Sequence, residues 1–82
     1  MKPSTSPPLR LSDLKKNQKG VVRNSVAQGL LKQKLISMGF IPGTEIVMIR
    51  NAPLRDPIEI SMQNYLVTLR RSEAQLIEVE AS

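Results

Sequence analysis

The 82-residue chain contains no cysteine, no histidine and no tryptophan, and its only aromatic residues are Phe40 and Tyr65. Without cysteine, neither a disulfide nor a thiolate metal site is available. Without histidine or cysteine, nucleophilic or general-base catalysis would rest on carboxylates alone. A glycine-rich phosphate loop ending in Gly-Lys-Ser or Gly-Lys-Thr is also missing, so the chain is not expected to hydrolyse GTP. We therefore expect a protein that is not an enzyme and has no resident cofactor.

Long apolar runs are missing too. No run approaches the roughly 20 residues that a membrane-spanning helix needs, and the first ten residues lack the apolar centre of a signal peptide. We expect a cytoplasmic protein without direct membrane insertion, with room for one domain. Residues 1–8 hold three prolines and three hydroxyl residues. This composition predicts a flexible N-terminal tail over 1–8 and a folded domain over 9–80.

Positive charge, by contrast, is abundant. Twelve Lys and Arg stand against seven Asp and Glu, a net charge of +5. Residues 1–34 carry eight of the basic side chains and a single acid, Asp13. Such an excess favours an acidic partner, whether nucleic acid, a membrane surface or an acidic protein face. An ordinary solvated basic surface is the alternative explanation.

Residues 30–38 predict a short helix with an abrupt end. Leu31, Leu35 and Met38 form one apolar stripe at helical spacing. Gly39 then stands where a helix ending favours a left-handed residue. With Gly39 in that position, Leu35 and Phe40 are the pair whose apolar contact accompanies a Schellman ending.

Turn signals and alternating runs follow. Pro42-Gly43 provides a preset φ followed by a residue that accepts positive φ, which predicts a type II turn leading into a strand over 44–49. Residues 58–63 alternate apolar and polar side chains, as in a half-buried strand. A tight turn at Asn64-Tyr65 would lead into a return strand over 66–70.

The remaining segments are short. Ser12 is a candidate N-cap for one turn over 13–15, and Ser72 and Gln75 have capping-box spacing. Residues 21–26 and 76–80 read as further strands. About five short strands and one short helix predict an all-β protein, a small β-barrel, and closure would remove exposed sheet edges.

Three blocks of the chain resemble the FeoA family of ferrous iron transport accessory proteins: MGFIPGT (38–44), APLRDPIEI (52–60) and LRRSEA (69–74). The resemblance covers roughly residues 9–80, and the blocks occur in the expected order and spacing. It implies an SH3-like β-barrel with a helical insertion after the first strand. It also implies a cytoplasmic partner of the membrane ferrous iron transporter that carries a G-protein domain, in a family associated with transition-metal handling. Arg55 stands where the family ordinarily has glycine, and Asn64 where a hairpin glycine is common.

A protein-interaction module is the function we favour from the sequence. Exposed leucines bordered by cations would suit an acidic protein surface, with charge setting the on-rate and the apolar centre the lifetime. The alternative is that Leu54 and Leu66 only fold over the barrel rim. The candidate partner-binding residues are Leu30, Lys32, Lys34, Leu54, Arg55, Leu66 and Arg70.

Two other functions remain as alternatives. Ferrous iron prefers imidazole, thiolate and carboxylate ligands, and only carboxylates are present, so at most weak chelation by Glu78 and Glu80 is expected. Asp56 and Glu59 begin a strand on which alternating side chains diverge. A basic nucleic-acid-binding barrel is the second alternative, but only two aromatic residues are present for base stacking. Weak self-association through a strand edge or loop is also conceivable for a small barrel.

Overall fold

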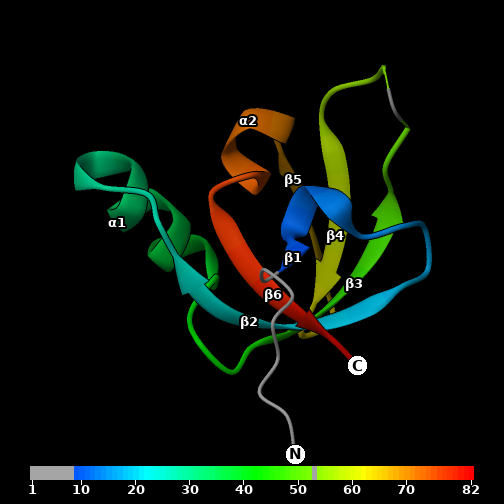
Figure 1. Cartoon of the computed structure of the whole chain (residues 1–82), viewed down its shortest axis with the longest axis horizontal. Helices are drawn as coiled ribbons and strands as arrows, with labels where there is room; N and C mark the ends of the chain where they lie inside the picture. The colour runs from blue at the N-terminus through cyan, green and yellow to red at the C-terminus, as the bar shows by residue number, and fades with distance from the viewer. Residues whose placement is uncertain (1–8, 53) are drawn as a thin grey trace, which may run out of the picture.

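The computed structural model describes residues 9–52 and 54–82, and in this part of the chain six strands form one antiparallel sheet. The strands follow the order β1-β6-β2-β3-β4-β5 across the sheet (Figure 1). Their bounds are β1 Leu9–Arg10, β2 Lys19–Ser25, β3 Glu45–Arg50, β4 Ile58–Met62, β5 Tyr65–Leu69 and β6 Ile77–Ala81. The tail predicted for residues 1–8 lies outside the described residues.

The described residues also form three short helical elements. They are the 3-10 helix η1 Leu11–Asp13, the helix α1 Gly29–Met38 and the one-turn helix α2 Arg71–Ala74. The two outer strands of the sheet, β1 and β5, lead into η1 and α2, which contact each other. The Arg10 guanidinium also donates to the Gln75 carbonyl oxygen at 3.3 Å. This hydrogen bond links the end of β1 to the residue that follows α2. The sheet therefore curves into the SH3-like barrel that the resemblance implies.

Residues 9–52 and 54–82 form six strands, one more than the predicted five. β1 is only two residues long, and its residues Leu9 and Arg10 pair with Val79 and Glu78 of β6. Two residues are too few to show an alternating pattern, so pairing with β6 defines this strand. Because β1 comes first, α1 is inserted after the second strand and not after the first.

The core contains the side chains that alternate inward along the strands. On β4, Ile58, Ile60 and Met62 are buried while Glu59 and Ser61 are partly exposed, as the alternating pattern predicts. Leu35 of α1 is fully buried, and Leu31 and Met38 pack against the same core. The largest buried side chains are Phe40, Leu11, Leu14, Leu35, Ile46, Met48, Ile58, Ile60, Met62, Leu69, Ile77 and Val22.

The end of α1 is a Schellman motif. Gly39 has a φ of 108°, and its N–H donates to the Ile36 carbonyl at 3.0 Å. The Phe40 N–H donates to the Leu35 carbonyl, also at 3.0 Å, and both side chains are buried. These two hydrogen bonds are the ones that the motif requires.

A type II turn follows directly. The Thr44 N–H donates to the Ile41 carbonyl at 3.1 Å, and Gly43 has a φ of 96°. Pro42 occupies the second position, where its restricted φ fits. The chain then enters β3 at Glu45.

Each predicted strand begins or ends one or two residues from the observed strand, and the two predicted helix caps were wrong by two residues. η1 begins after Arg10, whose N–H donates to the Asp13 carboxylate at 2.9 Å, so Ser12 is not the cap. α2 begins after Arg70, not Ser72, through the same device: the Arg70 N–H donates to Glu73 at 3.1 Å. In both helices the backbone N–H of the N-cap residue donates to an acidic side chain three residues later in the sequence. This acid therefore indicates where each helix begins.

The β4–β5 turn also lies one residue earlier than predicted. It is formed by Gln63 and Asn64, with φ values of 50° and 75°, and Tyr65 already belongs to β5. Two consecutive positive φ values are typical of a type I′ hairpin turn, and Asn accepts this conformation better than most residues.

Among the described residues, no helix is long and apolar enough to cross a membrane.

Candidate protein-interaction groove

A groove opens where the C-terminal half of α1, the β3–β4 loop, the end of β5 and α2 meet. Its volume is about 390 Å³. In Figure 1, α1 lies at the left, α2 at the top centre and the β3–β4 loop at the upper right. The residues that line this groove, called the α1–α2 groove below, are Lys34, Asp56, Pro57, Thr68, Leu69, Arg70 and Glu73.

Glu73 joins α1 to α2. One carboxylate oxygen accepts a hydrogen bond from the Lys34 ammonium at 3.0 Å, and the other accepts the Arg70 N–H at 3.1 Å. The hydrogen bond from Lys34 is the main reason that the pKa of Glu73 lies below its ordinary value, with the Arg70 N–H adding to it against the opposing effect of burial. Glu73 is therefore ionised at neutral pH and unsuited to act as a general acid.

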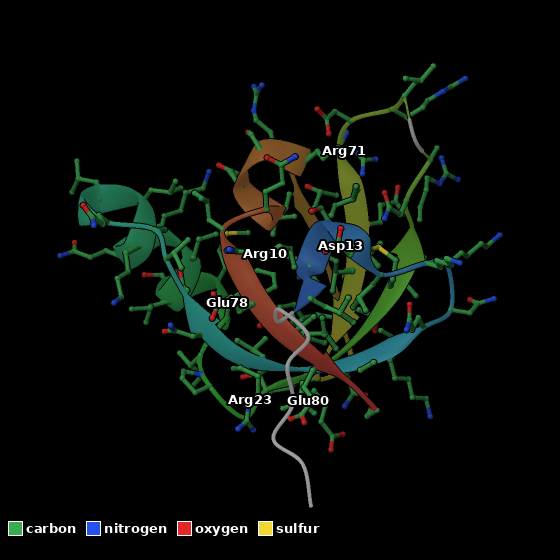
Figure 2. All side chains as sticks on the ribbon, in the orientation of Figure 1. Arg10, Asp13, Arg23, Arg71, Glu78 and Glu80 are labelled. Carbon is green, nitrogen blue, oxygen red and sulfur yellow. The ribbon has the colours of Figure 1, made fainter. Side chains whose placement is uncertain are left out.

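Arg71 fixes the opposite wall of the groove. Its backbone N–H donates to the Asp56 carboxylate at 2.9 Å. Its guanidinium donates to the carbonyl oxygens of Ala52 at 2.6 Å and Arg55 at 3.4 Å. Figure 2 shows Arg71 on α2, near the start of β4. Arg71 of α2 therefore anchors the β3–β4 loop through both its backbone N–H and its guanidinium.

The predicted partner-binding residues fall into three pairs and one separate residue, Leu66. Lys34 and Arg70 line the α1–α2 groove together. Leu30 and Lys32 are exposed on α1, and Leu54 and Arg55 are exposed on the loop across the groove. Leu30 is 84% exposed, and Leu54 is 98% exposed, so Leu54 does not fold over the barrel rim.

Leu66 lies apart from the other predicted residues. It is on β5, opposite Ser61 of β4, and is 58% exposed. It does not line the α1–α2 groove. Arg71, Asp56 and Glu73 were not predicted from the sequence as part of the site. Of these, only Glu73 could have been found, from its capping-box spacing to Arg70.

Recognition of proline-rich peptides, which SH3 domains achieve with aromatic grooves, is not supported by this lining. Phe40 is 1% exposed in the core. The Tyr65 hydroxyl donates to the Met38 carbonyl oxygen at 2.9 Å. Five of the seven residues that line the α1–α2 groove are charged or polar, which suits a charged protein surface.

Glu78 and Glu80, the two carboxylates expected to chelate metal weakly, each form an ion pair with an arginine. Glu78 forms an ion pair with Arg10 at 3.8 Å, and Glu80 forms one with Arg23 at 3.5 Å (Figure 2). Within residues 9–52 and 54–82, no three Asp or Glu side chains gather into a possible metal site. Weak chelation by Glu78 and Glu80 stays a prediction.

Comparisons with known proteins agree with the resemblance seen in the sequence. The FeoA domain family model matches residues 9–81. A fusion of Fe(2+) transport protein A and Fe(2+) transporter FeoB from Porphyromonas gingivalis is 38% identical over 72 residues, 88% of this chain and 8% of the fusion protein. The putative Fe(2+) transport protein A of Campylobacter jejuni is 34% identical, with 87% of this chain and 96% of that protein covered.

A solved structure extends the comparison to the fold. The crystal structure of Stenotrophomonas maltophilia FeoA, a prokaryotic SH3 domain protein complexed with zinc, superposes with a TM-score of 0.78. The match is 26% identical and covers 88% of this chain and 89% of that one. From the family model, the curated relatives and the shared fold, the chain belongs to the FeoA family.

Proposed function

We propose that the chain is a cytoplasmic accessory module of a ferrous iron transport system, which acts by binding the membrane transporter at its G-protein domain. The observation that carries this proposal is the fusion relative, in which the corresponding segment and a ferrous transporter belong to one polypeptide. Fusion keeps two proteins at a high effective concentration, an arrangement that suits modules that work together. The module acts by binding and not by catalysis.

The surface around the α1–α2 groove has the chemistry for such a contact. Leu30 on one side and Leu54 on the other provide exposed apolar side chains. Lys32 on α1 and Arg70 before α2 are exposed cations, and no ion pair is formed by either within the described residues. An acidic partner surface would be attracted by the cations and retained by the leucines.

Binding kinetics with the soluble G-protein domain of the transporter from the same organism test this proposal. Lys32→Glu should lower the association rate about tenfold at low salt, and salt should reduce that difference. Leu30→Ala should instead raise the dissociation rate. Lys19→Glu, an exposed charge reversal on β2, is the matched control and should change either rate less than about twofold.

Absence of binding by the unaltered protein at high concentration would overturn the proposal. Equal effects of Lys32→Glu and the control would show that only net charge matters, and would remove α1 from the interface.

A further inference from the structure

A second groove lies near the β3–β4 loop, and of the predicted partner-binding residues Arg55 alone lines it. Its volume is about 460 Å³. Three cationic side chains and one acid border it, so its lining carries a net charge of +2 at neutral pH. The residues of this basic groove are Lys16, Ile49, Arg50, Asn51, Ala52, Arg55 and Glu59.

The three cations of the basic groove differ from several others on the surface. The ion pairs in the described residues occupy Arg10, Arg23 and Lys34. None of these ion pairs involves Lys16, Arg50 or Arg55, although Glu59 lies opposite Arg50 in the β3–β4 register. Like charges gathered in a hollow repel one another and create a positive potential that an anion would neutralise.

The walls of the basic groove are held by hydrogen bonds. The Asn17 N–H donates to the Met48 carbonyl at 2.6 Å, which ties the η1–β2 loop to β3. The Asn51 amide nitrogen donates to the carbonyls of Ser12 at 3.0 Å and Leu14 at 2.6 Å. The Arg71 guanidinium holds the other end of the β3–β4 loop. A site built in this way loses little entropy when a ligand binds.

We propose that the basic groove binds an acidic segment of a protein. Carboxylates of that segment would pair with Lys16, Arg50 and Arg55, and an apolar side chain would contact the half-buried Ile49 and Ala52. Charge complementarity selects an acidic occupant. The inference rests on the proposed function only for the source of the segment, which is the cytoplasmic part of the transporter.

The lining favours a protein segment over nucleic acid. Single-stranded nucleic acids are commonly held by bases stacked on aromatic rings. The basic groove has no aromatic side chain, and the chain's two aromatic residues are engaged elsewhere, Phe40 in the core and Tyr65 with Met38. Its uncharged lining is Ile49, Ala52 and Asn51.

The direct test is an NMR titration with a short peptide of repeated Glu-Leu-Asp triplets. The largest shifts should fall on Lys16, Arg50 and Arg55 and should decrease with added salt. The double variant Lys16→Glu/Arg55→Glu should weaken peptide binding about tenfold or more. The matched double Lys19→Glu/Lys32→Glu changes the net charge equally outside the groove and should weaken it less than about twofold.

Three results would overturn the inference: equal weakening by both double variants, shifts centred elsewhere, or displacement of the peptide by a DNA duplex at equal concentration. The transporter's G-protein domain then separates the two proposals. If the unaltered protein binds it and Lys16→Glu/Arg55→Glu binds equally well, the transporter does not supply the segment, although the proposed function stands. If peptide shifts locate to the basic groove but the unaltered protein does not bind the transporter, the groove stands and the proposed function fails.

Discussion

Helix α1 and the β3–β4 loop both line one groove, through Lys34 and Asp56, yet the end of α1 and the loop are held in different ways. The end of α1 is fixed by neighbouring residues, through backbone hydrogen bonds from Gly39 and Phe40 back to the last turn of the helix. The loop is fixed from a distance, by the side chains of Asn51 and Arg71. A short sequence is sufficient to specify the first structure, whereas the second exists only once the barrel has formed.

The largest effect is expected at Gly39. A Cβ atom there would lie 2.8 Å from the Tyr65 hydroxyl and 3.4 Å from the Met62 methyl group, at a φ of 108°. Gly39→Ala should therefore cost about 2 kcal/mol of unfolding free energy, from backbone strain and the displaced Tyr65 hydrogen bond. Chemical denaturation measures this cost.

Gly43→Ala is the matched control for that substitution. Gly43 also has a positive φ, of 96°, but an added Cβ would meet nothing within 4 Å. It should cost about 1 kcal/mol, from backbone strain alone. Equal losses for the two variants would show that the contact with Tyr65 contributes nothing.

A smaller global effect is expected at Arg71. Arg71→Gln removes the guanidinium donors to Ala52 and Arg55 and should cost about 1 kcal/mol of unfolding free energy. Because the loop is held by this side chain, local opening should increase more than global unfolding. Hydrogen exchange at the Arg55 N–H, which donates to the Ala52 carbonyl at 3.1 Å, reports that opening.

Arg70→Gln serves as the control, since Arg70 is the adjacent and exposed arginine. Exchange at Arg55 should be unchanged in this variant. An Arg55 amide that remains equally protected in Arg71→Gln would mean that the loop does not depend on α2.

The smallest effect concerns the contact that joins α1 to α2. The lowered pKa of Glu73 means that its interaction with Lys34 stabilises the fold at neutral pH. This contribution is lost as the pH falls below the unfolded value of about 4.3 and through the lower folded pKa. Lys34→Ala should raise the pKa of Glu73, and the stability difference from the unaltered protein should shrink in acid.

Unfolding measurements at about pH 7 and about pH 3, with an NMR titration of the Glu73 carboxyl, test this prediction. Lys32→Ala is the control, because no ion pair is formed by Lys32 within the described residues. A pKa of Glu73 that does not move in Lys34→Ala would contradict the account of its cause.

The same division between local and distant contacts explains what the sequence could predict. Helix α1, its ending at Gly39 and the alternating strand β4 were predicted correctly. Each follows from residues that are close together in the sequence. β1 was missed, because its two residues become a strand only by pairing with β6. Both helix caps were placed too late, because serine was preferred to the Arg–Asp and Arg–Glu spacing that forms them.

The candidate site shows the same limit. Lys34 and Arg70 were predicted to bind a partner, and the structure brings them into one groove, while their role in binding stays a prediction. The roles of Arg71 and Asn51 could not be read from the sequence, since their carbonyl partners lie 16 to 39 residues away along the chain. The basic groove was missed for the same reason, since Lys16 meets Arg50 and Arg55 only through the fold.

The most direct test of the proposed function is a two-dimensional NMR titration of the protein with the soluble G-protein domain of its transporter. We predict shifts on Leu30, Lys32 and Arg70 and on the β3–β4 loop that weaken with salt, while the outward face of β6 at Glu78 and Glu80 stays unchanged. Shifts confined to β6, or no shifts at high concentration, would contradict the assignment of a transporter-binding surface to the α1–α2 groove.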